Sequence, residues 1–194
     1  MRHRSELRYK GHMKASIRVF SLFAIGLALG AMSVSARAAD APSGMKALFL
    51  QQLADVEKKM NSLAEAVPAE KYSWRPGAGV RSISEVFTHV AGANYFFPSI
   101  AGVKPPEGID RNMEKTVTEK SKVQAALKQS FEHARKAIEG LSAADMAKEV
   151  KFFGRPATVE AVVFTMANHM HEHLGQSIAY ARVNGVVPPW SAKE

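Results

Sequence analysis

Four stretches of the chain repeat apolar residues at spacings of three and four, which is the period of an amphipathic α-helix. They cover about residues 44–66, 82–98, 118–139 and 158–184. Each stretch has one apolar face, and four such faces are most simply buried by packing the helices against one another. The pattern therefore predicts an all-α fold, a four-helix bundle, with no internal repeat among its helices.

Local signals mark where these helices begin and end. Ser82 and Glu85 form an S-x-x-E capping box, in which the two side chains satisfy free N–H groups at the start of the second helix. Pro98 is expected to end that helix, because proline lacks the N–H that a continuing helix needs. Asn184-Gly185 is a typical exit from the fourth helix.

The connections between the helices carry signals of their own. Residues 72–77, Tyr-Ser-Trp-Arg-Pro-Gly, form an aromatic-rich turn between the first and second helices. Residues 102–112 contain two adjacent prolines and indicate a long crossover, which four-helix bundles accommodate. Residues 150–155 predict either a short extended segment or a hairpin before the fourth helix.

Residues 1–38 have the pattern of a secretory signal peptide rather than of a folded domain. Six basic residues and one acid precede an apolar run at residues 19–34, and Ala36-Arg37-Ala38 supplies an A-x-A cleavage site. We expect cleavage after Ala38, a periplasmic or secreted protein, and no stable membrane anchor afterwards. An uncleaved anchor is the alternative, although a span needs about 20 apolar residues. Met13 is an alternative start of translation.

Removing this segment changes what the charge implies. The chain has 26 basic and 18 acidic residues, of which residues 1–38 hold seven and one, leaving 19 and 17 in residues 39–194. A net charge of +2 does not indicate a nucleic-acid partner. The 156 remaining residues suit one domain.

The chain has no cysteine, so disulfides, thiolate ligands and a lipoprotein anchor are excluded. A metal site must therefore use histidine and carboxylate.

Two histidines share the apolar face of the fourth helix. Successive helical residues turn by about 100°. His169 and His173, four residues apart, therefore point the same way, on the stripe that contains Met166. His171 lies about 200° from His169 and should face solvent or the flank of the bundle.

A third histidine lies on the apolar stripe of the second helix. His89 lies on the same helical stripe as Val86, Ala93 and Phe96, at spacings of three and four residues, so its imidazole is expected to point inward. His133, two residues after an apolar position of the third helix, is expected to be exposed.

Three imidazoles directed into an apolar core need a partner, because a buried unpaired polar group costs about 1–3 kcal/mol. A divalent ion such as zinc, nickel or iron provides one, and three protein ligands leave a position open for water or substrate. The H-E-x-x-H motif of metalloproteases is absent from His169-Met170-His171-Glu172-His173. The alternative is that the three histidines are hydrogen-bonded core residues without a metal.

Several segments together resemble the DinB superfamily, a group of metal-binding four-helix bundles. They are Trp74-Arg75-Pro76, residues 82–90, residues 169–176 and residues 180–185, and the resemblance covers nearly all of residues 39–194. It implies an up-down-down-up bundle with zinc or nickel bound by His89, His169 and His173. It also implies kinship with thiol-dependent S-transferases and isomerases that act on small thiols.

These residues are consistent with two functions. The first is a metal-dependent hydrolase or thiol S-transferase for a small molecule, with Tyr72, Trp74 and Gln176 as candidates for lining or bracing the site. Tyr72 and Trp74 are alternatively loop anchors, and Glu85 is explained by capping, so no catalytic residue is identified. The second is a non-catalytic metal-binding or stress-related bundle, which should lack an open cavity beside the metal. Exposed residues of the first and third helices could form a homodimer.

Overall fold

The computed structural model describes residues 44–191 of the 194-residue chain. The predicted signal peptide, residues 1–38 with the alternative start at Met13, lies outside these residues and stays a prediction. Between residues 44 and 191, no helix combines the length and the apolar character that crossing a membrane requires.

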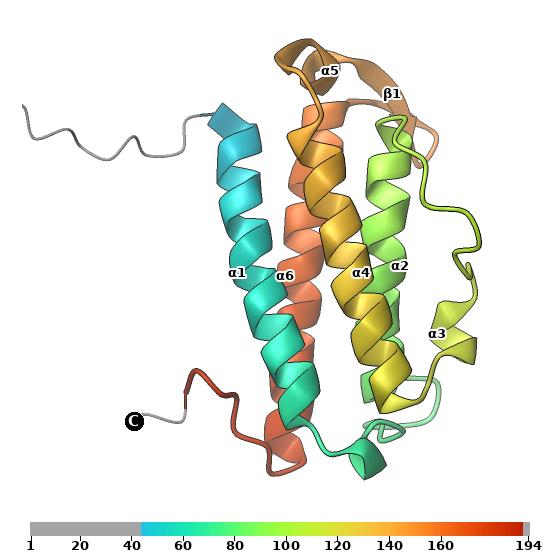
Figure 1. Ribbon diagram of the computed structural model, residues 1–194, viewed down its shortest axis with the longest axis vertical. Helices are drawn as coiled ribbons and strands as arrows, with labels where there is room; N and C mark the ends of the chain where they lie inside the picture. Colours follow the sequence, from blue (N-terminus) through green and yellow to red (C-terminus); the bar gives the residue numbers. More distant parts are fainter. Residues whose placement is uncertain (1–43, 192–194) are drawn as a thin grey trace, which may run out of the picture. The chain divides into compact units, whose positions relative to one another are not determined.

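The predicted helices form the bundle, with bounds close to those expected. They are α1 (Gly44–Ala66), α2 (Ile83–Ile100), α4 (Lys120–Glu139) and α6 (Val159–Val183). Both α1 and α2 pack against α4 and against α6, so α1 lies diagonally opposite α2 (Figure 1). One apolar face of each helix is buried between its two neighbours.

The order of helix directions is up-down-down-up, as the resemblance implied. Helices α2 and α4 run in the same direction, so the chain between them travels back along the side of the bundle (Figure 1). This crossover, residues 101–119, contains the four-residue helix α3 (Met113–Thr116), which the sequence did not predict. The crossover matters for function because it passes over one face of α2.

The start of α2 follows the prediction, and its end does not. The Ser82 hydroxyl accepts from the Glu85 N–H at 3.3 Å, and the Glu85 carboxylate accepts from the Ser82 N–H at 2.7 Å. The helix continues past Pro98 to Ile100. The prediction that it stops at Pro98 was wrong, because proline's fixed φ fits a helix and only one N–H is lost in the last turn.

A small structure joins α4 to α6 at one end of the bundle. It consists of α5 (Ala143–Ala147) and an antiparallel pair, β1 (Glu149–Phe152) and β2 (Arg155–Thr158). Of the two alternatives for residues 150–155, the hairpin is confirmed. The two turn residues, Phe153 and Gly154, have φ values of 48° and 79°, as a two-residue type I′ turn requires.

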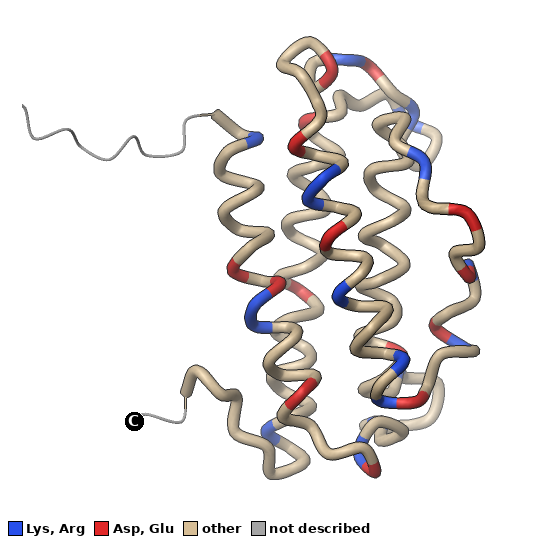
Figure 2. Tube along the Cα trace, in the orientation of Figure 1, with Lys and Arg blue, Asp and Glu red and all other residues tan. Residues whose placement is uncertain are grey.

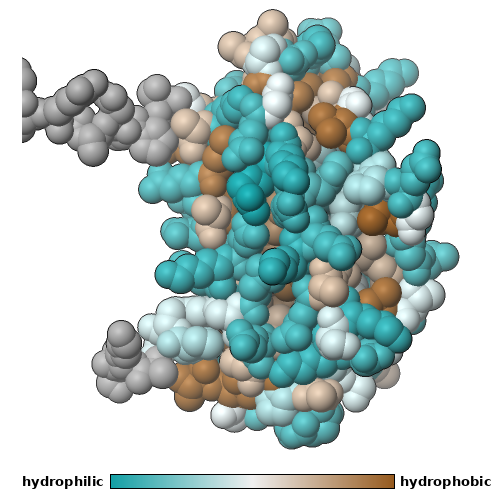
Figure 3. Space-filling model, viewed as in Figure 1, coloured by the Kyte–Doolittle hydropathy of each residue, from teal (hydrophilic) through white to brown (hydrophobic). Residues whose placement is uncertain are grey.

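The core is mainly apolar, with a few buried polar side chains such as Asn94 and Ser130 and one buried carboxylate, Glu85. Its largest fully buried side chains include Phe87, Phe131, Leu53, Met60 and Leu127. Figure 2 shows acidic and basic residues interspersed along the helices, and Figure 3 shows that the face formed by α1 and α4 is largely hydrophilic. At the end of α1, the short 3-10 helix η1 (Ala69–Lys71) leads into the aromatic-rich turn.

One predicted core position is exposed. Phe96 was placed on the inward stripe of α2, but its exposed fraction is 41%, whereas its neighbour Phe97 is buried at 5%. Both rings contact the β1–β2 hairpin, Phe97 through Phe152 and Phe96 through Phe153, each at 5.9 Å between ring centroids. Only Phe97 belongs to the buried core cluster, so the inward position at this end of α2 is one residue further along the chain than expected.

Candidate metal centre and adjoining pocket

The structure brings His89, His169 and His173 together. One ring nitrogen from each lies within 4.8 Å of one from each of the others. The Nε2 atoms of His89 and His169 are 3.0 Å apart. The convergence comes from the helices, since α6 supplies two histidines one turn apart and α2, packed against it, supplies the third.

The three histidines lie at the edge of the core rather than inside it. His173 is buried, with an exposed fraction of 8%, while His89 and His169 are half-buried. The expectation that all three point into an apolar interior is therefore correct for His173 alone. The other two face an open pocket, so a ligand can reach them.

Two of the imidazoles are oriented by side-chain oxygens. The Nδ1 of His89 lies 3.0 Å from Glu114 Oε2, and the Nδ1 of His173 lies 2.8 Å from Gln176 Oε1. Carboxylate and amide oxygens accept hydrogen bonds, so each Nδ1 carries the hydrogen and each Nε2 keeps a free lone pair. Gln176 in turn donates to the Tyr180 hydroxyl at 2.9 Å, which fixes its own orientation.

Glu114 is a candidate site residue that the sequence did not reveal. It sits on α3, and its second carboxylate oxygen accepts from Arg81 Nε at 2.9 Å. Burial raises the pKa of Glu114, but the hydrogen bonds from Arg81 and His89 outweigh it and leave the pKa below its usual value. Glu114 is therefore ionised at neutral pH, as a carboxylate that orients a metal-binding imidazole should be.

His169 is held neutral by its surroundings. Burial, followed by repulsion from His173 and His89, lowers its pKa to about 4. Burial also lowers the pKa of His89, together with the charge of Arg81, whereas the hydrogen bond that His89 donates to Glu114 raises it. Phe97 packs against His169 with ring centroids 5.5 Å apart. Within residues 44–191, His169 Nδ1 has no hydrogen-bond partner.

This donor set fits a divalent metal ion. Neutral imidazoles are good ligands for borderline ions, and two of the three have their outer nitrogen already engaged. Without a metal, one of the two Nε2 atoms that face each other at 3.0 Å must carry a hydrogen; a metal ion would replace that hydrogen by accepting both lone pairs. The group can therefore hold a divalent metal, whose identity the donors do not select.

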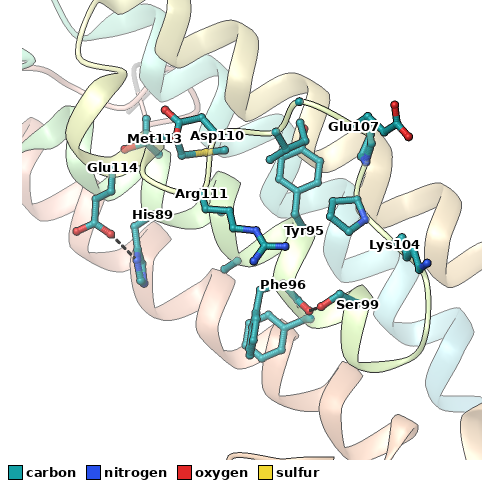
Figure 4. Close-up of a pocket in the computed structure, with 18 of the residues that line it drawn as sticks. His89, Tyr95, Phe96, Ser99, Lys104, Glu107, Asp110, Arg111, Met113 and Glu114 are labelled. Carbon is teal, nitrogen blue, oxygen red and sulfur yellow. Dashed lines mark hydrogen bonds and ion pairs between the residues drawn. The ribbon is translucent and has the colours of Figure 1, made fainter.

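A pocket of about 1020 Å³ opens beside His89 and His169. One wall is α2 and the other is the crossover (Figure 4). Phe153 of the hairpin also lines the pocket. Aromatic residues Tyr95, Phe96 and Phe97 line it. The open cavity is what distinguishes this arrangement from a closed structural site.

The other candidate residues have different places. Tyr72 is buried and donates to the Ala64 carbonyl at 2.6 Å, so it anchors the turn and does not line the pocket. Trp74 packs edge-on against Tyr180 at 5.3 Å between ring centroids. Gln176 braces His173, as expected of a supporting residue.

The two remaining histidines lie outside the cluster. His171 is exposed, as predicted, and its Nδ1 lies 2.8 Å from the Ala167 carbonyl. The prediction that His133 is exposed was wrong. It is half-buried because the ring of Tyr95 packs against it at 5.1 Å, and this burial lowers its pKa.

Comparison with known proteins places this geometry in a wider group. The family model of the DinB superfamily matches residues 52–177. A DinB-like protein from Bacillus cereus ATCC 10987 is 21% identical, with a TM-score of 0.65 over 73% of this chain and 93% of that one. YjoA, a DinB-like protein from Bacillus subtilis, is 18% identical, with a TM-score of 0.58 over 71% and 92%.

A third structure carries a functional description. YfiT from Bacillus subtilis, described as a probable metal-dependent hydrolase with an unusual four-helix bundle topology, is 16% identical. Its TM-score is 0.59 over 76% of this chain and 92% of that one. At these identities the similarity to solved structures shows the fold alone. None of the curated proteins matches this chain.

Proposed function

This chain belongs to the DinB superfamily, and we propose that it binds a divalent metal ion through His89, His169 and His173 and acts as an enzyme on a small molecule. The observation that carries the proposal is the convergence of three ring nitrogens within 4.8 Å beside an open pocket of about 1020 Å³. A non-catalytic site would not need that cavity.

Hydrolysis is the reaction class we favour, and thiol S-transfer is the second. YfiT, which shares the fold, is described as a probable metal-dependent hydrolase. The second class rests on the resemblance to the DinB superfamily, which implies kinship with thiol-dependent S-transferases. Bound zinc, nickel or iron would act as a Lewis acid that lowers the pKa of a water or thiol molecule. The same cluster serves either class, because both need an activated nucleophile at neutral pH.

The chain's own residues prepare the site. Glu114 and Gln176 hold the Nδ1 hydrogens of His89 and His173, which directs both Nε2 lone pairs towards one point. The environment of His169 keeps it unprotonated at neutral pH, so it does not need to lose a proton before it binds a cation. The ionised Glu114 adds a negative charge beside the cluster, which favours a cation there.

Metal content is the first test. The purified protein and its His169→Ala variant are compared by inductively coupled plasma mass spectrometry, after purification without a metal-binding tag. His171→Ala is the matched control, since His171 lies on the same helix but is exposed. We expect near-stoichiometric metal in the wild type and the control and none in His169→Ala. Absence of metal after addition of zinc, nickel and iron in turn would contradict the proposal.

Activity separates the two reaction classes. The metal-loaded protein is incubated with a panel of small esters and amides, with and without an added low-molecular-weight thiol. Hydrolysis that needs no thiol and stops on chelation supports the hydrolase, whereas product that forms only with thiol supports the transferase. A protein that binds metal and is inactive in both panels would favour the non-catalytic alternative.

We also propose that the protein is exported, on the basis of the pattern in residues 1–38. Sequencing the amino terminus of the protein recovered from the periplasm or the medium tests this directly. We expect the mature chain to begin at Ala39. Recovery of the uncleaved chain in the membrane fraction would instead support an anchor.

A further inference from the structure

We propose that the pocket beside the three histidines binds a flat, apolar organic anion, whose body contacts the aromatic lining and whose negative end is bound by Arg111. This names the substrate class of the site and rests on the proposed function, since it takes this pocket to be the place where the substrate lies. It adds a binding residue, Arg111, and an aromatic rim that the metal site does not require.

Exposed aromatic rings gather at the rim of the pocket. Phe96 on α2 and Phe153 on the hairpin have exposed fractions of 41% and 75%, and their ring centroids are 5.9 Å apart. Tyr95 and Phe97 line the same cavity further in. Large apolar side chains exposed together at the mouth of a cavity indicate a surface that a ligand covers.

The backbone conformation of Phe153 also supports a role for these exposed rings in ligand binding. Its φ of 48° lies in the left-handed region, where type I′ turns normally have Asn or Gly and where a bulky residue is strained. Burial does not explain the choice: the Phe153 ring lies against Phe152 and Phe96, at 4.4 and 5.9 Å between ring centroids, yet the residue remains 75% exposed. Strain kept at an exposed position beside a pocket points to a role in binding.

Arg111 supplies the charge that selects an anion. Its side chain reaches from the crossover into the pocket and ends between His89 and the aromatic residues Tyr95 and Phe96 (Figure 4). Among residues 44–191, no hydrogen bond or ion pair engages its guanidinium. Arg111 is exposed, and a guanidinium without an internal partner beside aromatic rings is suited to bidentate binding of a carboxylate that enters from solvent.

None of the three carboxylates that line the pocket forms an ion pair with this arginine. Glu114 is occupied by Arg81 and His89. Asp110 accepts from the Asn112 N–H and the Thr116 hydroxyl. The exposed carboxylate of Glu107 points away from the guanidinium (Figure 4).

The charges around the pocket favour an anionic ligand over a cationic one. Aromatic surfaces alone would also suit a cation, through the negative faces of the rings. Arg111 would repel a cation at the same place, and the imidazole cluster with its metal would add to that repulsion. The length of the pocket, from His89 at one end to Lys104 at the other, accommodates a body larger than a single ring (Figure 4).

Binding of 2-naphthoate tests the proposal, with the neutral 2-naphthalenemethanol as its isostere. Both are titrated into the purified protein by isothermal calorimetry, once with metal and once with chelator present. We expect naphthoate to bind at least about tenfold more tightly than the alcohol, which is the scale of one charge-assisted contact. Arg111→Gln should abolish that preference, whereas Arg182→Gln, an exposed arginine on α6 outside the pocket, should leave it intact.

A second pair of variants tests the aromatic rim. Phe153→Ala should weaken binding of both probes by about three- to tenfold, because stacking does not depend on the charge. Phe164→Ala is the control, since Phe164 is exposed at 53% on α6 and does not line the pocket. Circular dichroism of each variant establishes that it is folded.

The outcomes separate this inference from the proposed function. Naphthoate binding that persists with chelator and depends on Arg111 and Phe153 supports the inference even if no metal is found. Equal affinity for the two probes, unchanged binding in Arg111→Gln, or no binding of benzoate, 2-naphthoate and 4-phenylbenzoate at millimolar concentration would overturn it. A metal-loaded protein with any of those results would keep its proposed metal site and lose this substrate class.

Discussion

Replacing Glu85 with glutamine should destabilise the protein in a way that depends on pH. The carboxylate accepts from the Ser82 N–H at 2.7 Å and pairs with Arg75 at 3.0 Å and Lys115 at 3.3 Å. The backbone hydrogen bond from Ser82 is the largest cause that lowers the pKa of Glu85, from 4.5 to about 2; burial opposes it, and hydrogen bonds from Arg75 and Lys115 support it. Glu85→Gln keeps the shape and a carbonyl oxygen and removes the charge.

The size of the effect follows from that pKa. A shift of this extent corresponds to about 3 kcal/mol of stability as an upper limit. Arg75 and Lys115 are both exposed to solvent, so screening reduces what their ion pairs with Glu85 contribute to stability. We therefore expect Glu85→Gln to lower the free energy of unfolding by about 1–2 kcal/mol at pH 7. Because the folded pKa is depressed, this stability is present above pH 4.5 and is lost as the pH falls towards 2. About three fifths of the difference should be gone at pH 3.

Urea unfolding followed by circular dichroism at pH 7, 5, 4 and 3 measures this, with chelator present so that bound metal does not contribute. Glu65→Gln is the control, because Glu65 is exposed on α1. We expect the control to differ from the wild type by less than about 0.5 kcal/mol at every pH. A loss in Glu85→Gln that stays constant from pH 7 to pH 3 would refute the reasoning, since it would come from shape or hydrogen bonding rather than from charge.

Three further predictions concern the site, the hairpin and the core. Gln176→Leu removes the acceptor at His173 Nδ1 and should weaken metal binding about 10- to 100-fold in chelator competition; unchanged affinity would mean that Gln176 does not orient the imidazole. Phe153→Asn should raise the free energy of unfolding by about 1 kcal/mol, because asparagine tolerates the left-handed turn, and a destabilised variant would argue against strain there. Leu127→Ala should cost about 2–5 kcal/mol in urea unfolding, against little for the exposed Leu48→Ala, and similar costs would contradict the assigned core.

The parts of the fold that follow helical periodicity could be predicted from the sequence. His169 and His173 are four residues apart, so any helix through them aligns their side chains, and the same period directs His89 towards α6. The capping box at Ser82 is equally local, because both of its partners lie within one turn. These signals need no knowledge of how the helices meet.

The rest depends on contacts between segments far apart in the chain. Glu114 contacts His89 although the two residues are 25 positions apart in the sequence. It lies on a helix of four residues, which is too short to show a periodic pattern in the sequence. Whether Phe96 or Phe97 faces inward depends on how α2 packs against the other helices, and the spacing along α2 permits either. Arg111, likewise, is an ordinary loop residue in the sequence and becomes part of a pocket only through the path of the crossover.

The parallel course of α2 and α4 has a consequence for how this protein family can diversify. A chain that must return along the outside of the bundle brings a surface segment past the histidines, and most of residues 102–112 are exposed. The ligand-facing wall can therefore change in length and sequence without disturbing the helices that carry the imidazoles. Changes in the crossover can therefore alter what enters the pocket while the three histidines beside it stay in place.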